Sequence, residues 1–284
     1  MLKKGQISIF ILLGVILIVA VGFLLFVNNS EEENEVETSI AQSFDNSFIR
    51  TYTDSCLKNT AESGLILIGN RGGYYKLNKY TFNFFNNEIP YYFYLYADNY
   101  PNEDYIEQQI SLYIKDNINS CLKNLSIMEN YGYQIDFKEI AINTNINEKD
   151  ISIKMIYPVE LVKNNNKQII EEFNIKIGKF ELKKIIQTSQ KITDLFVQDS
   201  KNLCISCITQ ISEDSGLYIS IFDAPNATIV FNLMEYNNTF VKPYNFTFAV
   251  KYTGYSCSDL SGVLDESILD ACLNIEKEKL KENT

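Results

Sequence analysis

The feature that most constrains this chain is an uncharged apolar run close to its first residue. Ile7 to Val27 spans 21 residues without a charged side chain, and Lys3 and Lys4 lie shortly before it. At about 1.5 Å of rise per residue, a helix of this length covers roughly 31 Å, which matches the bilayer hydrocarbon core of about 30 Å. The sequence therefore predicts a transmembrane helix over residues 7–27, preceded by a cytoplasmic tail over residues 1–6.

The charges on either side of this run predict its orientation. Two lysines precede it, and a group of glutamates from Glu31 to Glu37 follows it. Because positive charge favours the cytoplasmic side, we expect a single-pass protein of the cell membrane that contacts the lipid through Ile7 to Val27, with its ectodomain outside. A cleaved signal peptide fits less well, because its one small-x-small site, Ala20 to Gly22, is followed by five more apolar residues.

The composition fits a location outside the cytoplasm. The net charge is −11, and the residues after the first 30 carry −13, which argues against a nucleic-acid partner. Six cysteines, an even number, suit an oxidising compartment in which disulfides persist. Five Asn-x-Ser/Thr sequons are candidate glycosylation sites on the outer side, at Asn28, Asn124, Asn226, Asn237 and Asn245.

Apolar residues at spacings of three and four predict the helices. A long amphipathic helix runs from Val36 to Ile68 and stops at the glycine-rich segment Gly69 to Gly73. The same spacing predicts helices over Pro101 to Leu125 and Phe180 to Ser200. The segment from Asp265 to Thr284 is typical of a helix that frays into alternating charge.

Alternating apolar and polar residues predict two groups of strands. The first is an antiparallel meander within residues 133–177, and the second comprises residues 217–222, 228–234 and 244–252. The predicted fold class is α+β, with the transmembrane helix, the long amphipathic helix and an antiparallel sheet in the ectodomain. We expect two parts in that ectodomain: an α+β part over residues 28–200, and a β-rich part with a C-terminal helix over residues 201–284.

A repeated pentapeptide suggests one disulfide. Ser-Cys-Leu-Lys-Asn occurs at Ser55 to Asn59 and again at Ser120 to Asn124, each time with the cysteine on the apolar face of a predicted helix. If the two helices pack side by side, Cys56 and Cys121 can be joined. Such a bridge would stabilise the fold by roughly 4 kcal/mol. Two buried free thiols are the alternative.

The other cysteines allow three interpretations. Cys204 and Cys207 form a Cys-x-x-Cys motif, which occurs in redox pairs and in zinc sites. A zinc site would also need Cys257 and Cys272, whose spacing is far longer than such sites use. No clean strand–motif–helix unit surrounds the motif, so structural disulfides among these four cysteines are the preferred interpretation.

The residues that are absent from the chain exclude much enzymatic chemistry. Without histidine, no Ser-His-Asp or Cys-His arrangement can form. No phosphate-binding glycine motif is present, since Gly69 to Gly73 lacks the necessary lysine and hydroxyl. Paired carboxylates for glycoside hydrolysis are open, but nothing singles out a pair. We therefore predict no enzymatic activity, no cofactor and no metal site.

An aromatic stretch is a candidate surface for a protein partner. The stretch from Tyr91 to Tyr100 is rich in tyrosine, which is enriched at interfaces. In a strand, Tyr91 and Phe93 would point one way and Tyr92 and Tyr94 the other, so one of the two sets is expected in the core.

The first residues of the chain contain a short motif, Lys3-Lys4-Gly5-Gln6-Ile7-Ser8-Ile9-Phe10. This motif resembles the class III signal of archaeal type IV prepilin-like proteins, in which Lys4 and Gly5 would match the cut site, and Gln6 and Ser8 the start of the apolar stem. The resemblance implies processing between Gly5 and Gln6. Phe10 stands where the family carries the glutamate that pairs with a neighbouring subunit, and this departure disfavours assembly into a filament.

The wider pattern resembles uncharacterised single-pass surface proteins of small-genome archaea. The shared features are this N-terminus, a long helix bearing Ser-Cys-Leu, a Gly-Gly-Tyr turn, a second helix with Cys-Leu, and a late strand at Phe248 to Tyr252. We expect a non-enzymatic, membrane-anchored envelope or surface protein with a structural or adhesion role. The alternatives are a minor pilin-like subunit processed after Gly5 and a membrane-tethered thiol–disulfide enzyme using Cys204 and Cys207.

Overall fold

The computed structural model describes most of the chain between residues 47 and 251. Residues 95–96, 164–165, 201, 237, 239 and 241–242 are the exceptions in that range, and residues 270, 273 and 274 are described beyond it. Contacts divide the chain into a unit of residues 1–52 and a unit of residues 53–284. The described part of the first unit is helical, and its Phe48 and Tyr52 rings stack with centroids 6.2 Å apart. All elements below belong to the second unit.

A large share of the sequence-based prediction concerns residues outside the described part. These are the predicted helix over residues 7–27, the processing site at Gly5 and Gln6, the sequons at Asn28 and Asn237, the cysteines Cys257 and Cys272, and most of the predicted C-terminal helix.

The predicted fold class is wrong in two respects. Among the described residues, no helix is long and apolar enough to cross a membrane, so the structure does not support the transmembrane helix that this fold class included. The described helices are amphipathic instead, as their apolar residues face a core. In addition, the strands do not form one antiparallel sheet. They form two sheets, and one of these is mixed, although the α+β content agrees with the prediction.

Three helical segments carry the N-terminal half of the larger unit. The first helix, as we call residues 53–70, ends where Gly73 N–H bonds to Ile68 O at 2.8 Å. Helix α2 (Glu103–Asn117) is capped by Asn102, which accepts the Tyr105 N–H, and has acidic residues in its first turn. Helix α3 (Asn119–Leu122) and the 3-10 helix η1 (Lys123–Tyr131) follow it directly.

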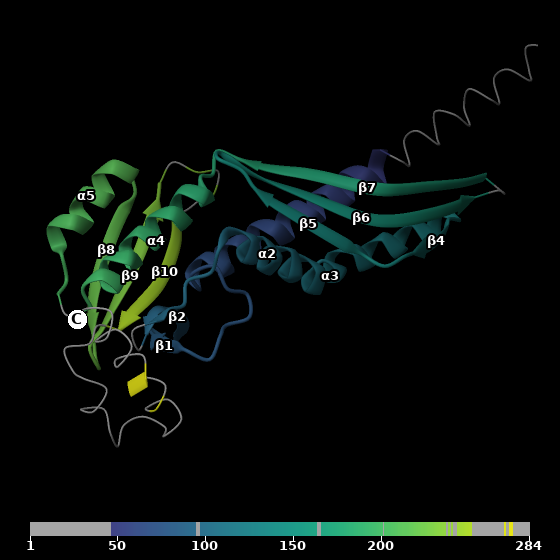
Figure 1. The fold of residues 1–284 in the computed structure, drawn as a ribbon. Helices are drawn as coiled ribbons and strands as arrows, with labels where there is room; N and C mark the ends of the chain where they lie inside the picture. Colours follow the sequence, from purple (N-terminus) through teal and green to yellow (C-terminus); the bar gives the residue numbers. More distant parts are fainter. Residues whose placement is uncertain are drawn as a thin grey trace, which may run out of the picture. The chain divides into compact units, whose positions relative to one another are not determined.

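The antiparallel sheet is built around strand β6 (Asp150–Lys163). Strand β7 (Asn166–Gly178) pairs with one edge of β6 from end to end. The other edge of β6 is shared by β4 (Gln134–Phe137) and β5 (Ala141–Ile146). Burial alternates along β6, as the sequence predicts, with Ile151, Ile153 and Met155 inside. Figure 1 shows β6 and β7 as long strands lying side by side, with the shorter β5 next to β6.

The second sheet is mixed and has the order β1–β2–β10–β9–β8. Its strands are β1 (Thr81–Phe84), β2 (Asn87–Tyr94), β8 (Tyr218–Ala224), β9 (Thr228–Glu235) and β10 (Tyr244–Lys251), with the short β3 (Ala97–Asp98) against β2. Strands β2 and β10 are parallel, and the other neighbours are antiparallel. Both flanks of the predicted join near residue 200 therefore contribute strands to one sheet.

The middle of the mixed sheet is buried on both faces. Consecutive residues of β2, β9 and β10 are buried, without the alternation of an exposed sheet. On one face Tyr92 stacks on Phe248 at 4.3 Å, and Phe196 of α4 meets Phe231 at 5.9 Å. On the other face Tyr91 packs within a cluster that contains Ile89, Val230 and Ala249.

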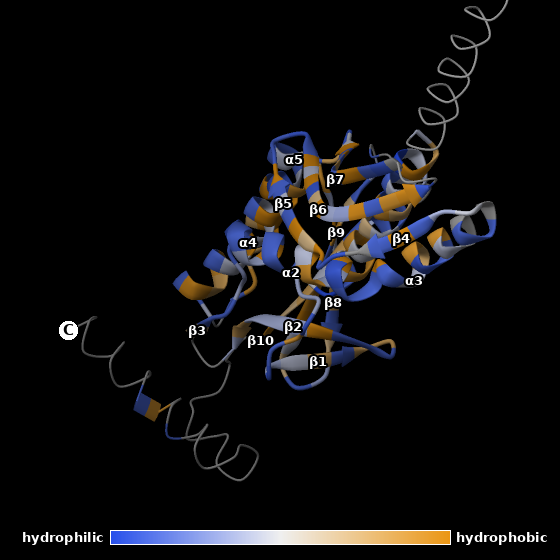
Figure 2. Cartoon of the chain, turned by 90° about the vertical axis from the view of Figure 1, so that its right-hand side faces the viewer, coloured by the Kyte–Doolittle hydropathy of each residue, from blue (hydrophilic) through white to orange (hydrophobic). Residues whose placement is uncertain are grey.

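Two helices connect the two sheets in the chain. Helix α4 (Leu182–Gln198) carries hydrophobic and hydrophilic residues on different sides, as the hydropathy colours in Figure 2 show. Helix α5 (Ile205–Ser215) ends at Gly216, which adopts a left-handed φ of 67°. Helix α4 agrees with the predicted helix over Phe180 to Ser200, whereas α5 was not predicted.

Candidate functional site

The Cys56–Cys121 disulfide joins the first helix to α3. The Cα atoms are 5.8 Å apart, and the two cysteines are separated by 65 positions in the sequence. This is the pairing that the repeated pentapeptide suggested. Cys56 is only 2% exposed, and its neighbours Leu57 and Leu122 are buried with it. Cys121 is half-buried, so the bridge links the packed side of the first helix to the edge of α3.

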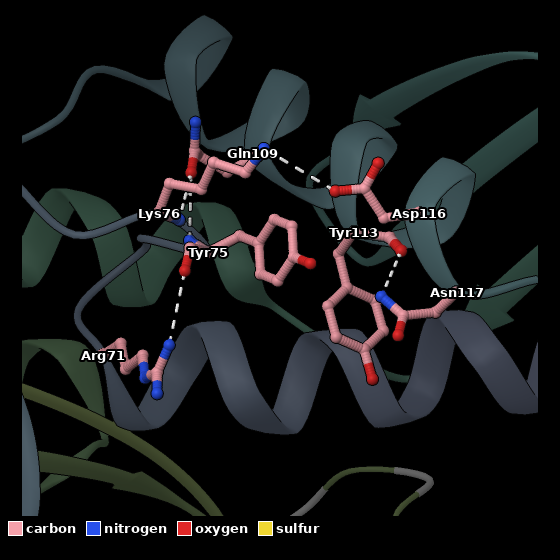
Figure 3. Close-up of polar contacts among 7 residues, drawn as sticks. All are labelled: Arg71, Tyr75, Lys76, Gln109, Tyr113, Asp116 and Asn117. Atoms are coloured by element: carbon pink, nitrogen blue, oxygen red, sulfur yellow. Dashed lines mark hydrogen bonds and ion pairs between the residues drawn. The ribbon is translucent and has the colours of Figure 1, made fainter.

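Helix α2 fixes the segment that follows the first helix by a set of polar contacts (Figure 3). The side-chain oxygen of Gln109 accepts the backbone N–H groups of Tyr75 and Lys76 at 3.0 and 2.9 Å. Lys76 Nζ lies 3.7 Å from Asp116, and Arg71 donates to the Tyr75 carbonyl at 3.3 Å. Because Gln109 is buried, the two hydrogen bonds that it accepts satisfy the N–H groups of Tyr75 and Lys76 without water.

The same helices approach each other closely at a glycine. A Cβ atom placed on Gly64 would lie 2.4 Å from a ring carbon of Tyr113, so only glycine admits this ring. Tyr113 in turn meets Tyr75 edge to face, with centroids 5.1 Å apart, as Figure 3 shows. This contact holds the first helix to α2, and the disulfide holds it to α3, which directly follows α2.

The Cys204–Cys207 disulfide occupies the N-terminus of α5. Its Cα atoms are 5.3 Å apart and its cysteines are three positions apart. Cys204 is the N-cap residue, and its sulfur accepts the Cys207 N–H at 3.2 Å. Both cysteines are half-buried. A helix N-terminus stabilises negative charge, so a thiolate released here by reduction would be stabilised.

The sequence contains a signal for α5 that was missed. Ile205, Ile208 and Ile211 recur at helical spacing, Cys204 precedes them, and Gly216 follows. The motif therefore opens a helix, as redox motifs do. The element before it is helix α4 and not a strand, so the strand–motif–helix unit is absent here, as predicted.

The aromatic stretch from Tyr91 to Tyr100 contributes largely to the core. Tyr91, Tyr92 and Phe93 are buried, because β2 lies between two strands and is covered on both faces. The Tyr92 hydroxyl donates to the Gly72 carbonyl at 2.8 Å. A partner surface in this stretch would depend on Tyr94 and Tyr100, which are half-exposed.

The described sequons lie in three different settings. Asn124 and Asn226 are exposed, in η1 and in the turn between β8 and β9. Asn245 is half-buried within β10, accepts a hydrogen bond from Asn232 at 3.1 Å and donates one to the Pro243 carbonyl at 3.3 Å. Asn124 and Asn226 are thus the accessible members of the predicted set within the described residues.

A cavity of about 750 Å³ lies beside the N-terminus of α4, and the sequence gave no indication of it. Its lining residues are Lys149, Lys179, Glu181, Lys184, Gly216, Tyr218, Glu235 and Tyr236. Glu235 is 6% exposed, and its Oε2 has no hydrogen-bond partner among the described residues. Burial raises the pKa of the Glu235 carboxyl, and the hydrogen bond from the Glu181 N–H and the charge of Lys184 oppose this shift.

A metal site does not emerge from the described residues, since no three of their Cys, Asp and Glu side chains gather as ligands. The comparisons with known proteins point to no function either. Neither a family model, nor a curated protein, nor a solved structure matches this chain. Function must therefore be argued from the two disulfides and the cavity.

Proposed function

We propose that this protein is a non-enzymatic structural or adhesion protein that works outside the cytoplasm, at the cell surface or in the envelope. The observation that carries the proposal is the Cys56–Cys121 disulfide, which joins the buried Cys56 of the first helix to the half-buried Cys121 of α3. Disulfides of this kind persist in oxidising compartments and are rare in reducing ones. The accessible sequons Asn124 and Asn226 agree with the same location.

Membrane attachment and the pilin-like alternative concern residues outside the described part, and the structure adds support to neither. Gly5 and Gln6 would be the processed residues of a pilin-like subunit. The proposal made here rests on the described residues alone.

The proposal is tested by mapping the disulfides in protein taken from intact cells. Thiols are blocked by alkylation at lysis, and the chain is digested with trypsin without reduction. We expect tryptic peptides 51–58 and 116–123, which contain Cys56 and Cys121, to appear as one linked species. Labelling of intact cells with a membrane-impermeant amine reagent should modify exposed lysines such as Lys191. Alkylated Cys56 and Cys121, or an unlabelled chain, would contradict the proposal.

Thiol–disulfide exchange at Cys204 and Cys207 is a second candidate, favoured by the N-cap position of Cys204. A thiolate of a substrate dithiol attacks one sulfur of the bridge, the S–S bond breaks, and the other cysteine leaves as a thiolate. The second substrate thiol then attacks the mixed disulfide. The substrate becomes a disulfide, the Cys204–Cys207 pair receives two electrons, and two protons move from the substrate to the pair.

This candidate is tested with a peptide that contains two free cysteines. After incubation, thiol trapping should find Cys204 and Cys207 alkylated, the peptide oxidised, and the Cys56–Cys121 bridge intact. If the Cys204–Cys207 bridge survives an excess of the peptide, the candidate has no mechanism and the structural role stands alone.

A further inference from the structure

The cavity beside α4 is lined by two lysines without ion-pair partners among the described residues and by exposed tyrosines. It is formed by the end of the β6–β7 pair, the N-terminus of α4, the edge strand β8 and the end of its neighbour β9. Its volume of about 750 Å³ lies in the range of small-molecule sites. The question is which ligand its lining would recognise.

Two lysines at the cavity lack ion-pair partners among the described residues. Lys149 comes directly before Asp150 and Lys179 directly after Gly178, which form the last pair of the β6–β7 ladder, and both lysines line the cavity. Like charges that share a small site repel each other. Neither lysine has an acidic partner in the described part, whereas the nearby Lys176 pairs with Asp150 at 2.9 Å. Such a pair of charges is favourable where an anion neutralises it.

The backbone at one of these lysines is unusual. Lys179 adopts a φ of 54°, in the left-handed region that residues other than glycine and asparagine seldom occupy. A glycine would occupy this position with less strain. The side chain is therefore present at a cost to the fold, and it lies at the cavity.

The third lysine and the acidic residues complete the charge pattern. Lys184 pairs with Glu181, and Glu235 uses one oxygen to accept the Glu181 N–H. Burial raises the pKa of the Glu235 carboxyl, and the lining as a whole holds three lysines against the two glutamates Glu181 and Glu235. Glu181 is the N-cap residue of α4, and no side chain caps this helix end. The N–H groups of an uncapped helix N-terminus favour a nearby negative charge. The cavity is therefore cationic in a protein whose net charge is −11.

Two exposed tyrosines flank the lysines. Tyr218 is 59% and Tyr236 is 66% exposed, and their rings meet edge to face with centroids 6.4 Å apart. They are stiff, amphipathic surfaces that cost little entropy to order, which is why tyrosine is common in recognition sites. The C–H groups of a sugar ring can pack on such a face while its hydroxyls remain hydrated.

We propose that this cavity binds an acidic saccharide, with Lys149 and Lys179 binding its anionic group and Tyr218 and Tyr236 packing against its ring. The inference rests on the proposed function, since surface and envelope proteins meet acidic glycans outside the cytoplasm. It adds a ligand class to that function. The lysines select the charge, and the tyrosines distinguish a sugar-borne anion from a free one.

The experiment is calorimetric titration of the full chain with three probes at low ionic strength. Tetragalacturonate carries both the ring and the carboxylate, neutral maltotetraose carries only the ring, and acetate carries only the anion. We expect binding of tetragalacturonate, with affinity for the other two probes weaker by at least about tenfold. Equal binding of acetate would identify an anion site without saccharide recognition and would overturn the proposal.

Matched variants locate the binding. Lys149→Ala/Lys179→Ala and Tyr218→Ala/Tyr236→Ala should each weaken tetragalacturonate binding by at least about tenfold. The control, Lys123→Ala/Lys191→Ala, removes two exposed lysines outside the cavity lining and should change affinity by less than about twofold. All of these side chains are exposed, so the variants should fold.

The outcomes separate this inference from the proposed function. An intact Cys56–Cys121 bridge together with no binding of tetragalacturonate would overturn the saccharide site and leave the proposed function standing. An equal effect of the control lysines would mean that binding follows overall charge and not this cavity, and would overturn the inference as well.

Discussion

The Cys56 and Cys204 regions contain the same covalent bond in different surroundings. The Cys56–Cys121 bridge links two helices, with Cys56 buried and Cys121 half-buried, and joins residues 65 positions apart. The Cys204–Cys207 bridge is half-buried at the start of one helix and joins residues three positions apart. The first restricts the unfolded chain over a long segment, whereas the second restricts little more than one helical turn.

This contrast indicates that a disulfide's role follows from loop length and access, and not from the bond itself. In the chain-entropy relation, a loop of 65 residues is worth about 4 kcal/mol and a loop of three about 1.6 kcal/mol. Both Cys204 and Cys207 are half-buried, whereas in the other bridge Cys121 is half-buried and Cys56 is only 2% exposed, so a thiol has less access to it. The long-loop bridge is therefore suited to stability, and the short-loop bridge can be opened without unfolding the protein.

The largest expected effect on stability comes from removal of the Cys56–Cys121 bridge. Cys56→Ala/Cys121→Ala should lower the free energy of unfolding by about 4 kcal/mol, because the unfolded chain regains the entropy of a long loop. Denaturant titration followed by circular dichroism measures the change. A loss below about 1 kcal/mol would show that the Gln109 and Tyr113 contacts hold these helices without the bridge.

Removal of the half-buried Cys204–Cys207 bridge should have a smaller effect. Cys204→Ala/Cys207→Ala should lower the free energy of unfolding by about 1.6 kcal/mol from the bridge, and by up to about 1 kcal/mol more from the lost N-cap. Cys204→Ser/Cys207→Ala is the matched control, since serine restores the cap without the bridge. If Cys204→Ala/Cys207→Ala lowers the free energy of unfolding as much as Cys56→Ala/Cys121→Ala does, the expected difference between the two bridges is wrong.

The smallest expected effect concerns Tyr74, inside the loop that Cys56–Cys121 closes. Its hydroxyl donates to the Asn99 carbonyl at 2.8 Å, so Tyr74→Phe should cost about 1 kcal/mol at pH 7. Burial and the neighbouring Tyr105 raise the pKa of Tyr74 from 10.0 to about 12. Since the folded pKa exceeds the unfolded one, this contribution is complete below pH 10 and is lost as pH rises to 12.

The alkaline loss is measured by denaturant titrations at several pH values. Tyr74→Phe should show a smaller loss of stability between pH 10 and 12 than the natural chain. Tyr218→Phe, at an exposed position, serves as the control and should leave the loss unchanged. Identical pH profiles for the natural chain and Tyr74→Phe would mean that other buried tyrosines, such as Tyr157, account for the whole effect.

Local pattern predicted most of the regular elements. Helical spacing gave α2 and α4, and the period of two gave β6, whose buried residues alternate as expected. The helix over residues 205–215 was not predicted, because its helical signal is short and consists only of Ile205, Ile208 and Ile211. The mixed sheet was also missed, since continuous burial in β2 and β10 has no period to detect.

The candidate sites were predictable to different degrees. The Cys56–Cys121 pairing could be predicted from the sequence, because a repeated pentapeptide places both cysteines on equivalent faces of two helices. The cavity could not be predicted, because Lys149 precedes β6, Tyr218 begins β8 and Glu235 ends β9, and no motif links them. Their proximity depends on how the two sheets and α4 pack.

The sequence by itself determined local properties: the acidic charge, the absence of histidine, the amphipathic helices and the alternation along β6. Only the tertiary structure decided the parallel pairing of β2 with β10 and the position of the aromatic stretch inside the core. The physical reason is that helix and strand periods record which face of a segment is buried. They do not record which distant segment buries it, and that choice depends on packing across the whole chain.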